Sequence, residues 1–357
     1  MSDPIRLARP DVGDAELRAV AEVVRSGQLT MGPKVDELEA ALADAVGTAH
    51  AAAVATGTAA LHLAVLALGI GPGDEVIVPA YTFPATANVV ELSGARAILV
   101  DVDPDTFLVE PAAVEAAVTS STRAVIAVHL FGRPVDWEAL QTAVPQDVAL
   151  IEDAAGALGA RYRGTPCGAL GLVGCFSFHP RKIVTTGEGG AVTTDEAELD
   201  AAVRRLRNHG WSAPGEMPAP GFHYRLSELQ SALGIPQLAR LEELLTARER
   251  VAGWYDERLD HLLLTPRAAD GDRHGWQAYV VQLDRRDHAL AALRDAGIEA
   301  QIGTWALHRL DAYRSQGWFP GADRAFERAL ALPLATTTTE DEVDRVCAVL
   351  VRFAARS

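Results

Sequence analysis

The sequence has few cysteines and no long apolar run, and each shortage excludes a class of protein; lysines are also scarce. No apolar run approaches the roughly 20 residues that a membrane-spanning helix needs. The three cysteines, Cys167, Cys175 and Cys347, fit neither a disulfide framework nor a metal-ligand spacing, so we expect no metal site. Two of them lie in apolar contexts, where we expect them to be buried as small hydrophobic residues.

Charge and the N-terminal residues restrict location and partners. Residues 1–14 lack the apolar centre of a signal peptide, so we expect a cytoplasmic protein. The net charge of −16 disfavours nucleic acid and anionic membranes as partners, and we interpret it as keeping the protein soluble. It does not exclude a phosphorylated small ligand, because the N–H groups at a helix N-terminus bind phosphate without a cationic side chain.

Two common nucleotide-binding motifs are also missing. The glycine-containing residues 69–76 lead into a strand rather than a helix, so they do not form a dinucleotide-binding fingerprint. No phosphate-binding G-x-x-x-x-G-K-[ST] loop exists. We therefore interpret these glycines as turn residues.

Short apolar segments alternate with helical patterns through the first half of the chain. Short, nearly all-apolar strands between helices predict an α/β fold with a mainly parallel sheet covered by helices on both faces. The predicted strands are residues 51–56, 75–80, 95–102, 123–130, 148–154, 174–178 and 190–194, and the predicted helices between them are 58–68, 83–92 and 111–118.

Two helices are predicted before this region. Residues 14–26 place Leu17, Val20 and Val24 on one helical stripe behind Asp14, which resembles an N-cap. Residues 35–46 repeat the pattern, and their stripe consists of Val35, Leu38 and Leu42.

The pattern changes near residue 210. Residues 209–225 are rich in Gly, Pro and aromatic residues and predict a long ordered loop. A long helical stretch broken near Gly234 and Pro236 follows, and then come a strand at 276–283 and helices at 288–297 and 340–352. We expect a large domain over residues 1–240, including the N-terminal helices, and a smaller α/β domain over residues 241–357.

Two segments at strand ends carry groups suited to chemistry. In TGTAALHLA (56–64) a strand ends, Gly57 permits a tight turn and a helix starts at Thr58, which points free N–H groups at an anion. Taken alone, this junction is better explained by plain helix capping. In IEDAAGALGA (151–160), Glu152 and Asp153 end a buried strand at the edge where α/β sheets bind ligands. A protonated pyridine nitrogen would suit Asp153, and capping of the following turn is an equal alternative.

A third segment, FSFHPRKIVTTGEGG (176–190), places Lys182 between aromatic residues and a glycine cluster. A lysine amine attacks carbonyl groups only when neutral, and desolvation or a neighbouring cation lowers its pKa. Pyridoxal 5'-phosphate (PLP) requires an anion site, a carboxylate for its ring nitrogen, a lysine for its aldehyde and an aromatic lid. All of these groups occur in this one chain. Their combination favours a PLP site over helix capping and turn capping as separate explanations.

These segments resemble the DegT/StrS-type sugar aminotransferases, which have the fold of aspartate-aminotransferase-like PLP enzymes. The resemblance runs from SGQLTMGPKVDELEAALA (26–43) to LALPL near residue 334, and its most specific block is FSFHPRK with TTGEGG. It implies that Lys182 carries PLP as a Schiff base and that Asp153 keeps the pyridine nitrogen protonated. By the same resemblance, the cofactor-binding residues are Gly57, Thr58, Ala59, Phe83, Asp153, Gly156, Ser177, Lys182 and His223, with Thr58, Ala59 and Ser177 on the phosphate and Phe83 stacked on the ring.

The resemblance also implies a homodimer with shared active sites. His223, in GFHYR (221–225), corresponds to a residue that reaches the phosphate of the partner subunit. Thr30, Glu188 and His308 fall where the family lines the mouth of the active site. For His308 the alternative is a packed structural histidine.

Two positions depart from the family pattern. Gly156 stands where the family often has Gln, which removes an amide expected near the phenolic oxygen of the cofactor. His223 stands where the family has Asn and could carry a positive charge.

The sequence therefore predicts a PLP-dependent aminotransferase. The resemblance implies L-glutamate or L-glutamine as the amino donor and a nucleotide-activated keto-deoxy sugar as the acceptor. A free cyclic polyol ketone is the alternative acceptor. Sugar dehydratases of this scaffold replace the lysine with histidine, and a non-catalytic binding protein would not need both Lys182 and Asp153, so these two alternatives are disfavoured.

Overall fold

A seven-stranded sheet forms the centre of the protein in the computed structural model, which describes residues 4–354. Residues 1–3, at the start of the N-terminal segment considered above, and residues 355–357 lie outside the described part. All strands of the sheet are parallel except β10, which pairs antiparallel with both of its neighbours. In order across the sheet, the strands are β1 (His50–Val54), β10 (Gly190–Thr194), β9 (Val173–Ser177), β6 (Ala149–Asp153), β5 (Thr122–Val128), β2 (Glu75–Pro79) and β4 (Arg96–Val100).

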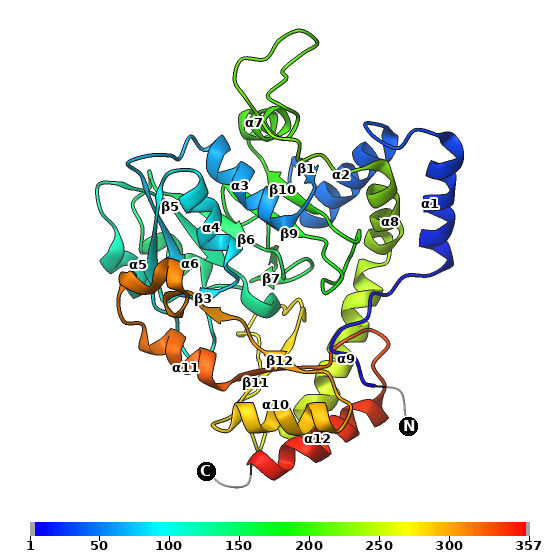
Figure 1. Ribbon diagram of the computed structural model, residues 1–357, viewed down its shortest axis with the longest axis vertical. Coiled ribbons are helices and arrows are strands. Elements are labelled where there is room, and N and C mark those ends of the chain that lie inside the picture. Colours follow the sequence, from blue (N-terminus) through cyan, green and yellow to red (C-terminus); the bar gives the residue numbers. More distant parts are fainter. Residues whose placement is uncertain (1–3, 355–357) are drawn as a thin grey trace.

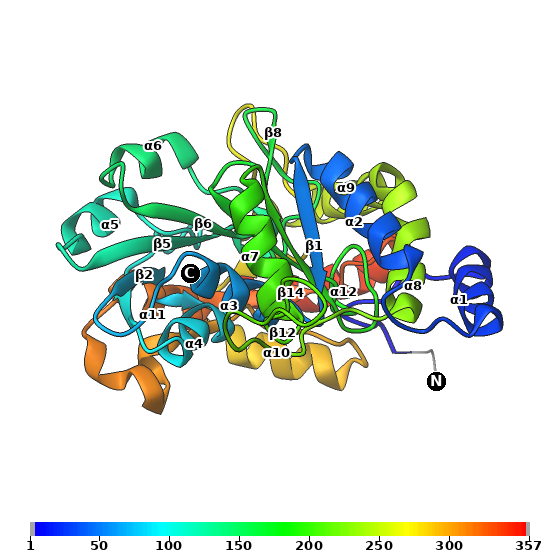
Figure 2. The ribbon, with the colours of Figure 1, turned by 90° about the horizontal axis from the view of Figure 1, so that it is seen from above.

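Helices cover both faces of this sheet, as Figure 2 shows. One face carries α3 (Gly57–Ala67), α4 (Ala85–Leu92) and α7 (Ala197–Arg207), and the other carries α2 (Pro33–Val46), α5 (Pro111–Ala117) and α6 (Trp137–Thr142). The strands are buried along most of their length, which explains their nearly continuous apolar sequences. The predicted α/β fold with a mainly parallel sheet is confirmed.

The C-terminal third forms a second, smaller sheet with its own helices (Figure 1). A hydrophobic cluster joins this sheet to the helices and also includes Ile5 from the N-terminal segment. The strands are β11 (Tyr279–Gln282), β14 (Ala329–Leu332) and β12 (Gln301–Ile302), and the helices are α9 (Leu241–Leu259), α10 (Arg286–Asp295) and α12 (Glu340–Ala354). The division at residue 240, which stays a prediction, coincides with the junction of α8 (Glu228–Ala239) and α9.

Short elements connect the two parts of the chain. β13 (Trp305–Ala306), from the C-terminal third, pairs antiparallel with β3 (Tyr81–Thr82), which precedes α4. The remaining elements are α11 (Pro320–Arg328), the hairpin of β7 (Arg161–Tyr162) and β8 (Thr165–Pro166), and the 3-10 turns η1 (Leu130–Gly132), η2 (Leu307–Arg309) and η3 (Asp311–Gln316).

The first helix differs from its prediction in the face it buries. α1 (Asp14–Ser26) begins at Asp14, but Gly13 occupies the N-cap position. Leu17 and Val24, on the predicted apolar stripe, are 68% and 59% exposed. The buried face instead contains Glu16, whose carboxylate accepts the Gly13 N–H at 2.7 Å and lies 3.3 Å from Arg240. An apolar stripe therefore remains on the outside of this helix.

The predicted break near Gly234 and Pro236 is also misplaced. Both residues lie within α8, and the helix ends at Arg240. Gly234 is required here because a Cβ atom would approach Thr186 to 2.9 Å and Leu38 to 3.1 Å. The glycine therefore serves the close packing of α8 rather than a turn.

The structure also bears on the expectations for the cysteines and for membrane-spanning helices. All three cysteines are buried, as was expected for two of them. Among residues 4–354, no helix combines the length and the apolar character needed to cross a bilayer.

One buried carboxylate joins the starts of two helices. Glu228 is the first residue of α8, and its two oxygens accept the N–H groups of Lys34 (2.8 Å) and Val35 (3.0 Å) in the first turn of α2. Gly32 permits this approach, because a Cβ atom there would lie 2.6 Å from the carboxylate. Glu228 thus supplies α2 with a cap that Gly32, the N-cap residue, lacks.

We predict that Glu228→Ala destabilises the protein by about 2–4 kcal/mol, because one buried and one partly buried N–H group lose a charged acceptor. Thermal and urea unfolding of the variant would measure the change. Glu37→Ala is the matched control, since Glu37 lies in the same helix but makes only an exposed ion pair with Lys34. The control should change stability by less than about 1 kcal/mol. Equal effects of the two substitutions would show that Glu228 does not cap α2.

Candidate active site

Lys182 lies in the loop that connects β9 to β10. Backbone bonds fold this loop back on itself, from Lys182 to His179 (2.8 Å) and from Thr186 to Phe178 (3.0 Å). The side chain of Gln237 on α8 holds the loop by bonding both the N–H (3.0 Å) and the C=O (2.8 Å) of Thr185. The loop position of Lys182 is therefore fixed by its neighbours.

The amine of Lys182 has no hydrogen bond or ion pair within residues 4–354. Burial lowers its pKa to about 8, against the attraction of Asp153 and with the help of the Arg181 and Arg248 cations. This lowered pKa makes the neutral fraction of the amine near physiological pH far larger than that of an ordinary lysine. This is the state that a nucleophilic lysine requires.

Asp153 ends β6 at the carboxyl edge of the sheet, as predicted. Its Oδ2 accepts the Thr86 hydroxyl at 2.8 Å, and its Oδ1 accepts the Ala155 N–H at 3.2 Å. Burial raises the pKa of this carboxyl, while the two donors and the Lys182 charge lower it. The carboxylate is buried beside neutral donors, so a cationic ring nitrogen would offset its desolvation.

Thr86 extends this arrangement into α4. Its hydroxyl also lies 3.2 Å from the hydroxyl of Thr82 at the end of β3, and both threonines are buried. The contacts fix the carboxylate of Asp153 through a short hydrogen-bonded chain. Thr86 was not predicted, because in the sequence it resembles any residue of a helix interior.

The turn from β1 to α3 has the backbone geometry expected of the predicted anion site. The N-cap residue is Thr56, whose hydroxyl accepts the Ala59 N–H at 3.0 Å. The N–H groups of Gly57 and Thr58 have no acceptor within the helix and remain for a ligand. Thr56 was not predicted in this role, and the role of Ala59 at the phosphate stays a prediction.

Two glycines bring this helix start against the two strands that flank Lys182 in the sequence. A Cβ atom on Gly57 would lie 2.7 Å from Cβ and 3.2 Å from Oγ of Ser177 at the end of β9. A Cβ atom on Gly190, in β10, would lie 2.5 Å from the Thr56 oxygen. Only glycine permits these approaches, so the hydroxyl of Ser177 lies beside the free N–H groups of α3.

A buried network beneath Asp153 anchors the same strand end. Glu152 accepts N–H groups from Gly168 (2.6 Å), Leu170 (2.8 Å) and Gly171 (2.7 Å) and contacts Nε2 of His129 at 2.9 Å. Cys167 lies close to the same two side chains. Nδ1 of His129 accepts the Val135 N–H at 3.0 Å, which leaves Nε2 as the nitrogen that donates to Glu152. The four contacts use the acceptor sites of Glu152, and we interpret the cluster as a structural anchor rather than a metal site.

The other predicted site residues lie farther out. Phe83 directly follows β3 and is 62% exposed, which leaves an aromatic face free. Thr30 and Glu188 are exposed, and His308 is buried with Nε2 3.0 Å from Asp323 on α11. These placements leave the roles of the four residues as predictions.

His223 lies in the segment between α7 and α8, where its backbone forms an isolated antiparallel bridge with Asn208 at the end of α7. It is exposed, and its ring stacks on His209 with the centroids 5.1 Å apart and the planes at 9°. The neighbouring backbone is fixed, since Ala55 donates to the Tyr224 carbonyl at 2.8 Å. The loop is thus attached next to the anion site, while His223 itself faces outwards.

Taken together, these groups suit PLP. Free N–H groups and a serine hydroxyl match its phosphate, a buried carboxylate matches its ring nitrogen, and an amine of lowered pKa matches its aldehyde. The three sets come from loops at one edge of the central sheet, where α/β proteins bind ligands.

Comparisons with known proteins agree with this geometry. The sequence profile of the DegT/DnrJ/EryC1/StrS aminotransferase family matches residues 10–351. DesV of S. venezuelae, solved in complex with a ketimine intermediate, is 33% identical over 100% of both chains with a TM-score of 0.94. The aminotransferase TlmJ of Streptoalloteichus hindustanus is 34% identical over 98% of this chain and 99% of its own, also with a TM-score of 0.94.

Two further structures bear on the ligands of the family. Spr1654 of Streptococcus pneumoniae has been solved in its PLP form and is 29% identical over 98% of both chains, with a TM-score of 0.94. DesI, solved in the presence of its TDP-sugar product, is 34% identical over 100% of this chain and 94% of its own, with a TM-score of 0.93. The chain belongs to the DegT/DnrJ/EryC1/StrS aminotransferase family and is a PLP-dependent aminotransferase.

Proposed function

We propose that the protein transfers an amino group from L-glutamate or L-glutamine to a nucleotide-activated keto-deoxy sugar. The observation that carries the proposal is the uncommitted amine of Lys182, with its lowered pKa, beside the buried carboxylate of Asp153. The sugar-nucleotide class is supported by the structure of DesI with its TDP-sugar product. A screen of nucleotide-linked keto sugars and free cyclic ketones, with each donor, tests it. Turnover of cyclic ketones alone would overturn the acceptor assignment.

Different residues would act on the aldehyde, the ring nitrogen and the phosphate of PLP in this reaction. Bound PLP supplies an electrophilic aldehyde and a ring that accepts electrons. Nζ of Lys182, when neutral, would hold PLP at its aldehyde carbon and, once released by an amino donor, would move protons at the reacting carbons. Asp153 keeps a proton on the ring nitrogen, while Thr86 and Ala155 fix its carboxylate. Gly57, Thr58 and Ser177 hold the phosphate through N–H and O–H donors.

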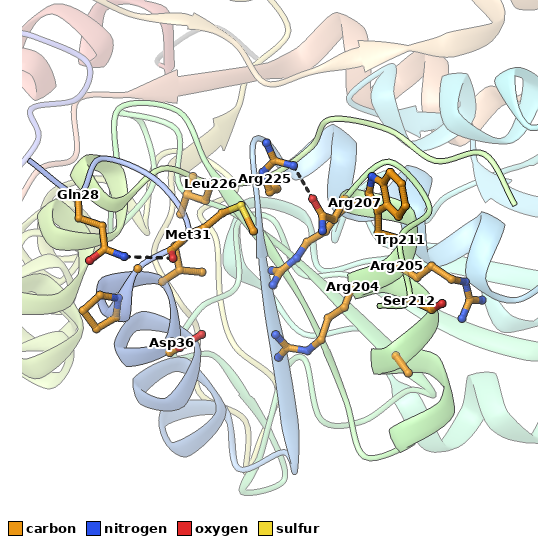
Figure 3. A pocket seen from close by; sticks show the side chains of 15 residues that line it. Gln28, Met31, Asp36, Arg204, Arg205, Arg207, Trp211, Ser212, Arg225 and Leu226 are labelled. Atoms are coloured by element: carbon orange, nitrogen blue, oxygen red, sulfur yellow. Dashed lines mark hydrogen bonds between the residues drawn. The ribbon is translucent and has the colours of Figure 1, made fainter. Parts of the chain in front are cut away.

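The same proposal includes a homodimer with shared active sites. A cavity of about 790 Å³ lies between the start of α2 and the end of α7, and four arginines, Arg204, Arg205, Arg207 and Arg225, line it (Figure 3). Exposed apolar side chains adjoin it, among them Met31 and Trp211. A second copy of this chain would cover these side chains and the outward-facing His223.

We predict that borohydride reduction of the PLP-loaded protein leaves a pyridoxyl group on Lys182. Peptide mapping is decisive because Lys34 is the only other lysine of the chain. Formation of the covalent link should increase with pH around a midpoint near 8, below the ordinary lysine value of 10.5, because the neutral amine reacts. A modified Lys34, or a midpoint near the ordinary value, would contradict the assignment.

We predict that Asp153→Asn lowers transamination by orders of magnitude, because an amide does not keep the ring nitrogen protonated. Single-turnover kinetics with glutamate would measure the loss. Thr86→Val, which removes only the hydroxyl donor to Asp153, should reduce the rate less. Near-normal turnover by Asp153→Asn would mean that the carboxylate only caps its turn.

We predict that inactive Lys182→Ala and weakened His223→Ala subunits complement each other when mixed. Each mixed dimer then has one site with both lesions and one with neither, so activity should exceed that of either parent. His223→Ala should also retain PLP less well, because a charge-assisted bond to phosphate contributes about 1.5–3 kcal/mol. Activity that merely averages the parents after confirmed subunit exchange would assign His223 to its own chain.

A further inference from the structure

The segment that enters β11 passes directly over the strand end of the active site. Its backbone is bonded to the η1 turn, through Gly275 N–H to Gly132 O (2.7 Å) and Gln277 N–H to Phe131 O (3.1 Å). Gly132 has a φ of 99°, and a Cβ atom there would lie 2.9 Å from the Trp276 nitrogen. The glycine at residue 132 therefore allows residues 275–277 to pack against the η1 turn. This packing fixes the position of the Gln277 backbone.

The side chain of Gln277 lies against Gly156, three residues after Asp153. A Cβ atom on Gly156 would lie 3.3 Å from Cγ and 3.4 Å from both Cβ and Oε1 of Gln277. The amide of Gln277 thus extends through the space that a longer side chain at residue 156 would need. Gly156 does not have a positive φ, so its backbone does not require glycine, and Gln277 is the group that limits its size.

A single buried cation ties this segment to the loop of Lys182. Nη1 of Arg248, on α9, donates to the carbonyls of Trp276 (2.9 Å) and Gln277 (3.3 Å), and Nη2 donates to that of Lys182 (3.5 Å). The two residues are therefore held by one side chain, although they are 95 positions apart in the sequence. Gln277 belongs to the surroundings of the Lys182 loop as well as to those of Gly156.

The amide of Gln277 is uncommitted. Its side chain makes no hydrogen bond within the described residues, and the residue is neither fully buried nor exposed. The backbone of Gln277 is fixed, its side chain runs along Gly156, and its amide has no partner. Such an amide is suited to binding a ligand rather than to stabilising the fold.

We propose that Gln277 is a positioning residue for PLP, and that its amide donates to the cofactor from the space left by the missing side chain at Gly156. The proposal rests on PLP binding at Lys182 and Asp153. The polar group that the family commonly supplies from residue 156 is here supplied from the C-terminal third of the chain. The phenolic oxygen of PLP is the acceptor, because it is the ring substituent for which the amide at residue 156 was expected.

Equilibrium titration of the apoprotein with PLP tests the proposal, together with the pH titration of the visible absorption band of the bound cofactor. Gln277→Ala should weaken PLP binding by about ten-fold and shift the titration of the band, because an N–H donor to an anionic oxygen is lost. Gln277→Glu keeps the shape but offers no donor at neutral pH, so it should weaken binding at least as much. Gln141→Ala, an exposed substitution on α6, is the matched control and should change neither quantity.

The reciprocal variant distinguishes a specific amide from a general packing effect. Gly156→Gln with Gln277→Ala moves the amide to the other segment and should recover most of the lost affinity and the original band titration. Wild-type affinity and titration in both Gln277→Ala and Gln277→Glu would overturn the proposal, as would an equal loss in Gln141→Ala. These measurements need no sugar acceptor, so a failed acceptor screen would leave them unaffected, and failure of the wild type to bind PLP would instead count against the site itself.

Discussion

The burial of Asp153 beside an amine without a fixed partner is the constraint on which the rest of the site depends. An unpaired buried carboxylate is costly, and here burial raises its pKa while it lowers that of Lys182. Thr86 and the Ala155 N–H compensate only in part. A ligand that brings a cationic ring nitrogen and an aldehyde relieves both groups at once, so the electrostatics of the site suit PLP.

This preparation requires a rigid backbone, and buried contacts provide it. Glu152 accepts hydrogen bonds from three backbone N–H groups and contacts the His129 ring. These bonds fix the end of β6, where Asp153 lies. Gly57 and Gly190 let the start of α3 contact β9 and β10 at distances that no side chain would allow. The phosphate donors and the carboxylate are therefore positioned by the same sheet and move little relative to each other.

The sequence was sufficient for the elements with strong local patterns. The strands of the central sheet and the helix of Val35, Leu38 and Leu42 follow from apolar spacing. The roles of Lys182 and Asp153 rest on the family resemblance and stay predictions. The sequence-based prediction failed for features that depend on tertiary packing. These features are the buried face of α1, the continuity of α8 through Pro236 and the contacts of Thr86. No local pattern could show that Gln277 lies over Gly156, because that contact depends on the path of a distant segment.

The predicted site residues separate into an inner and an outer group, and the physical character of the two differs. The inner group, around Asp153, Ser177 and Lys182, is held by buried hydrogen bonds and close glycine contacts within one chain. The outer group includes Thr30 and His223, which are exposed. They lie within two residues of Met31 and Arg225, and these two side chains line a cavity rich in arginine. An inner group that is complete and an outer group that faces solvent are what a shared site would leave on a single subunit. The order of the motifs along the sequence does not distinguish the two groups. It shows which residues are present, but not whether a residue would act in its own subunit or in that of a partner.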